Sequence, residues 1–213
     1  TLKNAWLTEN QNLFTFAYDY RKSVVDSATS LNSFLGNKVI GKKANIVAHS
    51  MGGLVARYCF EKVSGCSDKI GKIITAGTPH KGLIMAYQLW EGGELDRDPL
   101  MKLIEEIALH STNLPYLSNK DIIQNKFPGV KDLLPTPLIS NPLLESLSNT
   151  PTITTLSGNN LATYENFSTT PLSALDKALG LWIDGKPNVY STGIGDGTVL
   201  KSSSNIFGTD YSV

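Results

Sequence analysis

The chain has 213 residues, of which 41% are hydrophobic and 18% are charged, a balance typical of a folded globular domain. Nineteen lysines and arginines equal 19 aspartates and glutamates, so the formal net charge is zero. Because no basic excess is present to neutralise phosphates, we exclude nucleic acid as a partner. The apolar stretches span only a few residues, and we therefore expect no integral membrane segment.

Strands and helices are predicted to alternate in the first third of the chain. Apolar runs at residues 13–18, 44–49 and 72–76 predict three buried strands. Helical spacing of apolar residues predicts amphipathic helices over residues 24–35 and 54–60. Alternation of this kind indicates an α/β fold with a mostly parallel sheet and helices on both faces.

The alternation stops between residues 82 and 149, where the sequence is helical or loop-like and contains several prolines. A stretch of this length between sheet elements is usually a functional insertion, so we predict a cap or lid. The core of the domain is then formed by residues 1–81 and 150–213.

Sheet character resumes after the predicted cap. Residues 152–157 predict a strand, and residues 173–181 predict a helical piece. Residues 188–191 then lead into a glycine-rich turn at 193–197.

The most informative segment surrounds Ser50, which lies between a predicted strand and a predicted helix. Ala48 lies two residues before this serine and Gly52 two residues after it, as in the G-x-S-x-G nucleophile elbow with alanine in place of the first glycine. Small flanking residues are needed because the turn is tight and the serine must project from it. The Met51 backbone N–H, at the start of the helix, could then donate to an oxyanion. The alternative is a glycine-rich turn with a capping serine.

Five segments in a fixed order carry a resemblance to a known family. In chain order they are YDYR at 18–21, AHSMGGLVARY at 48–58, GTPHKG at 77–82, DLLP at 132–135 and GDGTV at 195–199. Together they resemble the α/β-hydrolases that include lecithin:cholesterol acyltransferase, lysosomal phospholipase and bacterial lipase-like enzymes. The resemblance covers most of the chain, and it implies Ser50 as nucleophile, Asp196 as catalytic acid and a lipid acyl ester as substrate.

Asp196 is also a candidate without the resemblance. An acid in a glycine-rich turn after a late strand can orient a histidine that an activated serine requires. Asp184, which precedes Gly185, is the rival, and either carboxylate could instead bond its own turn backbone.

No histidine lies where this fold needs one. The chain order in such enzymes is serine, acid, histidine, yet His49, His80 and His110 all precede Asp196. We expect His49 to point away from Ser50. His80 is expected to order the cap entrance, and His110 to lie on the surface or within the cap.

The second oxyanion donor is also missing, because nothing in residues 1–12 resembles the His-Gly loop that usually supplies it. We interpret the chain as a fragment, with that loop before Thr1 and the histidine after Val213. We therefore expect the 213-residue chain alone to have little or no hydrolase activity.

The predicted function is a serine esterase or acyltransferase that acts on lipid acyl esters through an acyl-enzyme, without cofactor or metal. The alternative is a catalytically incomplete hydrolase-like module that binds a lipid or protein partner. The cap would make any contact with a lipid interface. Several of its apolar residues would line an acyl channel or else form the cap's own core. These residues are Trp90, Leu114, Tyr116, Phe127, Leu133 and Leu134.

Two further features are left open by the sequence. Cys59 and Cys66 could form a disulfide or remain buried free thiols. An abundance of serine, threonine and asparagine, with only three arginines, favours a secreted or cell-surface protein.

Overall fold

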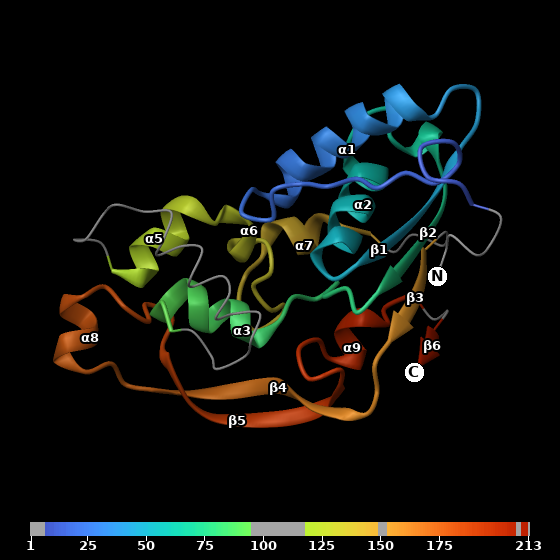
Figure 1. Ribbon diagram of the computed structural model, residues 1–213. Coiled ribbons are helices and arrows are strands. Elements are labelled where there is room, and N and C mark those ends of the chain that lie inside the picture. The colour runs from blue at the N-terminus through green and yellow to red at the C-terminus, as the bar shows by residue number, and fades with distance from the viewer. Residues whose placement is uncertain (1–6, 95–117, 149–152, 208–209, 213) are drawn as a thin grey trace.

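A parallel sheet lies at one end of the molecule (Figure 1). The computed structural model describes residues 7–94, 118–148, 153–207 and 210–212. The strands, in spatial order, are β1 (Ala44–His49), β2 (Ile70–Ala76), β3 (Ile153–Ser157) and β6 (Asp210–Ser212). All three pairings are parallel, which confirms the predicted α/β class.

Two helices cover one face of this sheet. Helix α1 (Val24–Lys38) begins at Ser23, whose side chain accepts from the Asp26 N–H, and α2 (Met51–Lys62) follows β1 directly. Their buried residues form one core with Ile73 and Ile153. Successive strand residues point to opposite faces, so Val47 lies on the other face, where it is 56% exposed.

The prediction of a strand at residues 13–18 was wrong. Residues 14–19 are not assigned to a strand, and this segment runs alongside α1 in Figure 1. The Phe16 ring lies 5.9 Å from that of Tyr18 and 5.3 Å from that of Phe34 on α1. Aromatic packing against a helix therefore accounts for the apolar pattern that predicted a strand.

An antiparallel hairpin extends below the other elements in Figure 1. It is formed by β4 (Leu161–Thr170) and β5 (Lys186–Gly195), joined through the short helix α8 (Ala174–Ala178). The sequence predicted a longer form of α8 but not β4, and β5 extends to Gly195, within the predicted glycine-rich turn.

Short helices account for most of the described chain between β2 and β3, within the predicted cap. They are α3 (Ile84–Tyr87), the π-helical turn η3 (Gln88–Gly92), α5 (Asn119–Lys126), α6 (Pro128–Lys131) and α7 (Pro142–Ser146). Elsewhere the chain forms the 3₁₀ turn η2 (Ser67–Lys69) and α9 (Lys201–Ser204). The division at residues 82 and 149 stays a prediction. None of the described helices has the length and apolar character that a bilayer crossing requires.

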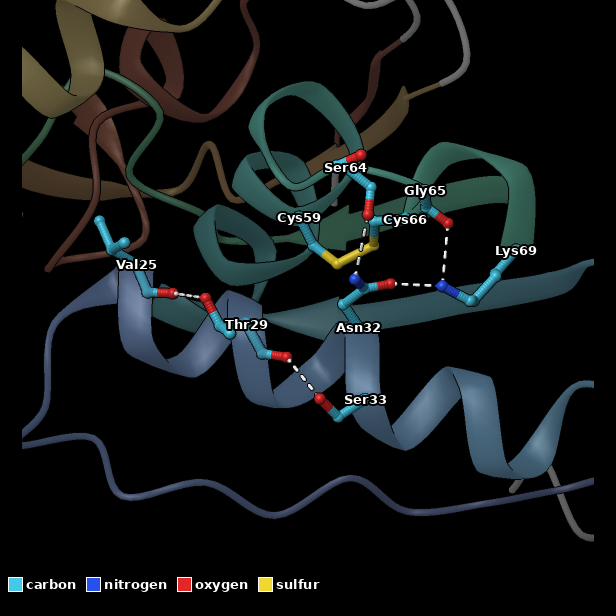
Figure 2. Close-up of a disulfide and its surroundings, with 9 residues drawn as sticks. All are labelled: Val25, Thr29, Asn32, Ser33, Cys59, Ser64, Gly65, Cys66 and Lys69. Atoms are coloured by element: carbon cyan, nitrogen blue, oxygen red, sulfur yellow. Dashed lines mark hydrogen bonds between the residues drawn. A yellow bond between two sulfur atoms is a disulfide. The ribbon is translucent and has the colours of Figure 1, made fainter.

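A disulfide joins the end of α2 to the turn before β2 (Figure 2). Cys59 and Cys66 are both buried, and their Cα atoms lie 5.7 Å apart. The Asn32 amide on α1 donates to a carbonyl of the intervening loop, and the Lys69 ammonium donates to Asn32 Oδ1 at 2.7 Å. The bond and these contacts fix the connection between the helix and the next strand.

Candidate active site

Ser50 lies on a sharp turn between the last residue of β1 and the first residue of α2. Its φ of 51° and ψ of −134° define a conformation that residues with a side chain seldom adopt. The Ser50 N–H donates to the Ala76 carbonyl at 2.9 Å, which ties the turn to the end of β2. The strained backbone is therefore held by the neighbouring strand.

The segment after β2 also supports this turn. The Thr78 hydroxyl donates to the Ser50 carbonyl at 2.9 Å, and the Gly53 N–H donates to the same oxygen at 3.0 Å. The Thr78 side chain occupies the space that a Cβ on Gly53 would need. A Cβ on Gly52 would make only ordinary contacts, the nearest with the Tyr18 hydroxyl at 3.6 Å. The strict requirement for glycine thus lies at Gly53, one residue beyond the position in the predicted motif.

The Met51 N–H is the first donor of a helix 12 residues long. It has no acceptor among the described residues, as expected in the first turn of a helix, where no preceding carbonyl is available. The partial positive charge of the helix N-terminus favours a negative oxygen at this point. The arrangement matches one half of an oxyanion hole.

Asp196 lies at the same end of the sheet as this turn. Its Oδ1 atom accepts from the N–H groups of Thr198 and Val199, at 2.9 and 2.6 Å. Its Oδ2 atom lies 3.0 Å from where a Cβ on Gly77 would be, and its own Cβ lies against Gly158. These glycines follow β2 and β3 directly, and Oδ2 has no hydrogen bond to another described residue. One carboxylate oxygen is thus fixed while the other is open to a donor.

The rival carboxylate, Asp184, lies elsewhere. It is exposed in the connection between α8 and β5, while Asp196 follows the other end of β5. A ten-residue strand is roughly 33 Å long, so the two carboxylates cannot share a site. Asp196 is the carboxylate that lies at the same end of the sheet as Ser50.

His80 is buried, with 2% of its surface exposed, and its Nε2 atom lies 3.3 Å from the Thr75 hydroxyl. Desolvation, reinforced by the charge of Arg57, lowers the pKa of this imidazole to about 3. Its Nδ1 atom has no partner among the described residues, and its ring packs edge-on against Phe207. His80 is therefore neutral at ordinary pH, and it faces Thr75 instead of the site.

His49 is exposed, and its Nε2 atom lies 4.0 Å from where a Cβ on Gly77 would be. It thus shares the neighbourhood of Asp196, which the sequence did not indicate. Within the described part of the chain, no histidine is hydrogen-bonded to Ser50 or Asp196. His110 lies outside the described residues.

The predicted channel residues are mostly packed inward. Phe127 and Leu134 are buried in hydrophobic clusters, and Trp90 and Leu133 pack against such clusters. Leu114 and Tyr116 lie outside the described residues. A cavity of about 370 Å³ lies between residues 81–84, 135–138 and the β4–β5 hairpin, and its lining includes none of these side chains. An acyl channel formed by the predicted residues therefore stays a prediction. Those of them that the structure describes pack in or against the hydrophobic clusters.

A parallel α/β sheet with a serine on a strand-to-helix turn is the architecture of the α/β-hydrolases. The chain belongs to the lecithin:cholesterol acyltransferase family, whose model matches residues 1–176. The resemblance noted in the sequence is thereby confirmed. A sequence comparison with curated proteins finds no match.

Solved structures of bacterial lipases resemble the chain distantly. The mature form of the Bacillus licheniformis lipase BlEst2 is 18% identical, with a TM-score of 0.48, and the match covers 92% of this chain and 67% of that one. The propeptide form is 18% identical, with a TM-score of 0.45 and 91% and 36% coverage. Lipase 1 from Pelosinus fermentans is 17% identical, with a TM-score of 0.35 and 76% and 57% coverage. The chain thus spans between about a third and two thirds of these proteins.

Proposed function

We propose that this chain carries the nucleophile and the acid of a serine esterase or acyltransferase that acts on lipid acyl esters. Membership of the lecithin:cholesterol acyltransferase family supports the broader class of lipid ester hydrolase or acyltransferase. The observation that carries the finer assignment is the strained turn at Ser50, with a free Met51 N–H beside it and Asp196 at the same sheet edge.

In the proposed reaction, Ser50 Oγ gives its proton to an imidazole and bonds to the acyl carbonyl carbon. The carbonyl oxygen becomes an oxyanion, to which the Met51 N–H donates. When the C–O bond to the alcohol breaks, the imidazolium returns its proton to the leaving oxygen. Water or an acceptor alcohol then removes the acyl group from Ser50.

The open Oδ2 atom of Asp196 suits an imidazole N–H, because Oδ1 is already held by two backbone donors. His80 does not fit this role, since it is buried and faces Thr75. His49 lies near Asp196 but has no hydrogen bond to that carboxylate or to Ser50 among the described residues. We therefore propose that the base comes from outside the described residues.

Labelling with a fluorophosphonate probe tests the nucleophile in the full-length natural protein. We expect the probe on the peptide that contains Ser50, and we expect Ser50→Ala to abolish labelling. Asp196→Asn should slow labelling at least a hundredfold, because an imidazole without its carboxylate is wrongly oriented. Asp184→Asn is the matched control and should label at the natural rate.

The substrate class is tested with p-nitrophenyl esters of increasing chain length. Faster turnover of esters longer than acetate supports a lipid substrate, and a preference for acetate contradicts it. Absence of labelling at Ser50 in the folded full-length protein would instead favour a non-catalytic module that binds a lipid or protein partner.

A further inference from the structure

Three large aliphatic side chains project from the connection between β4 and β5. Leu175 is 67% exposed, Leu179 is 58% exposed and Ile183 is 72% exposed. Leu175 and Leu179 are four residues apart across α8, so they lie on one side of that turn. In Figure 1 this connection lies at the extreme end of the hairpin, away from the sheet. We call these three residues the apolar tip.

The backbone beneath the apolar tip is held firmly. The Trp182 N–H donates to the Glu91 carbonyl at 2.8 Å, and the Ile183 N–H donates to Glu91 Oε2 at 3.0 Å. The Lys120 ammonium donates to the Gly180 carbonyl at 2.6 Å and lies 3.4 Å from Glu91 Oε2. Both Lys120 and Glu91 are buried. The connection is therefore tied to η3 and α5 by buried polar groups.

The Trp182 side chain anchors the same connection. Its ring is buried and lies against Gly92, leaving no space for a Cβ there. The Tyr87 hydroxyl donates to the Gly185 carbonyl at 2.6 Å. The tryptophan of this connection thus occupies the interior, whereas its three aliphatic side chains are exposed to water. Exposed apolar side chains that gather in one place mark an interaction site more often than isolated ones do.

The surroundings of the apolar tip carry almost no net charge. Three carboxylates and two ammonium groups lie on or beside it, a net charge of −1, from Glu94, Asp176, Asp184, Lys177 and Lys186. Attraction to an anionic membrane requires a basic excess, which is missing here. An uncharged apolar phase is the complementary partner.

We propose that the apolar tip inserts into the surface of a zwitterionic lipid layer. A standard protein interface involves about 20 to 30 residues on each side, whereas the tip offers three side chains at the end of a projecting hairpin. Three aliphatic groups at the end of the hairpin suit shallow insertion among acyl chains. The proposal places lipid contact on the β4–β5 hairpin, whereas the sequence had predicted it for the cap. The inference goes beyond the proposed function, because it concerns a surface far from Ser50.

The test is flotation of the full-length natural protein with vesicles of diether phosphatidylcholine. Ether lipids contain no ester bond, so binding is measured without any contribution from catalysis. We expect binding that is unchanged within twofold in 0.5 M NaCl or with 30% anionic lipid. No binding to these vesicles, or binding that depends on anionic lipid, would overturn the proposal.

The decisive variant is Leu175→Ser/Leu179→Ser/Ile183→Ser, for which we expect at least a tenfold loss of partitioning. The matched control removes three exposed aliphatic side chains elsewhere, Val25→Ser/Ile40→Ser/Leu138→Ser. It should bind within twofold of the natural protein. Equal partitioning of both variants would overturn the proposal.

A second measurement applies even if the triple variant does not fold. Leu179→Cys, labelled with a polarity-sensitive dye, should show a blue shift when vesicles are added, and labelled Ile40→Cys should not. Since Cys59 and Cys66 are bonded and buried, they do not compete for the label. Identical responses from the two sites would contradict insertion of the tip.

Discussion

The side chain of Thr78 occupies the space that a Cβ on Gly53 would need, and its hydroxyl holds the carbonyl of Ser50. We therefore predict that Gly53→Ala destabilises the protein by about 2 kcal/mol or more, because Thr78 must move or the helix must shift. Gly52→Ala, whose Cβ would make only ordinary contacts, should be neutral or slightly stabilising, since alanine favours helix over glycine. Urea unfolding of the two variants measures the difference. Equal stabilities would contradict the assigned contact.

The conformation of Ser50 leads to a second prediction. A residue with φ of 51° and ψ of −134° carries strain of roughly 1 to 3 kcal/mol, which glycine avoids. Ser50→Gly should therefore be about 1 kcal/mol more stable than Ser50→Ala, although both lack the hydroxyl. Thermal unfolding of the pair checks this, and a more stable alanine variant would show that the turn is unstrained.

The buried imidazole of His80 makes stability depend on pH. Its pKa is lowered to about 3 in the folded state, so below about pH 6.5 the unfolded chain binds a proton that the folded chain does not. Stability should fall as pH falls from 6.5 towards 3, by about 1.4 kcal/mol per pH unit from this group. His80→Gln cannot take up that proton, so its free energy of unfolding should depend less on pH over this range. The control is Asn37→Gln at an exposed position, which removes no titrating group, so the pH dependence of its stability should match that of the natural protein.

The disulfide provides a fourth prediction. Cys59 and Cys66 close a short loop, and removing such a crosslink costs about 2 to 3 kcal/mol in the chain-entropy account. Cys59→Ala/Cys66→Ala should unfold at lower denaturant than the oxidised natural protein. Reductant should lower the midpoint of the natural protein but leave that of the double variant unchanged. A double variant as stable as the oxidised protein would contradict the prediction.

The order of β1, α2 and β2 could be predicted because each element carries its own pattern. Short apolar runs alternate with amphipathic spacing, and a parallel pair requires a helical crossover. β4 could not be predicted, because most of its residues are polar or exposed and no alternation marks one buried face. The prediction of a strand at residues 13–18 was wrong for the opposite reason. Its aromatic residues pack on α1, and this gives the segment the apolar pattern of a buried strand.

The candidate site was predictable only in its local part. Ser50 and Met51 are adjacent in sequence, and the strand-to-helix context indicates their geometry. The space for Asp196 is created by Gly77 and Gly158, which belong to loops 81 residues apart, and no spacing rule connects them. The interpretation of the cysteines was open for the same reason, because their approach depends on how α2 ends before β2.

Ser50 and Asp196 lie at the same edge of the sheet although they are 146 positions apart in the chain. A ribosome adds about 5 to 20 residues per second, so the carboxylate is synthesised roughly 7 to 30 s after the serine. The strands that hold the turn at Ser50 are made early, whereas Asp196 arrives only after the β4–β5 hairpin. During translation the Ser50 hydroxyl is therefore present, for many seconds, on a nascent chain that does not yet contain the Asp196 carboxylate.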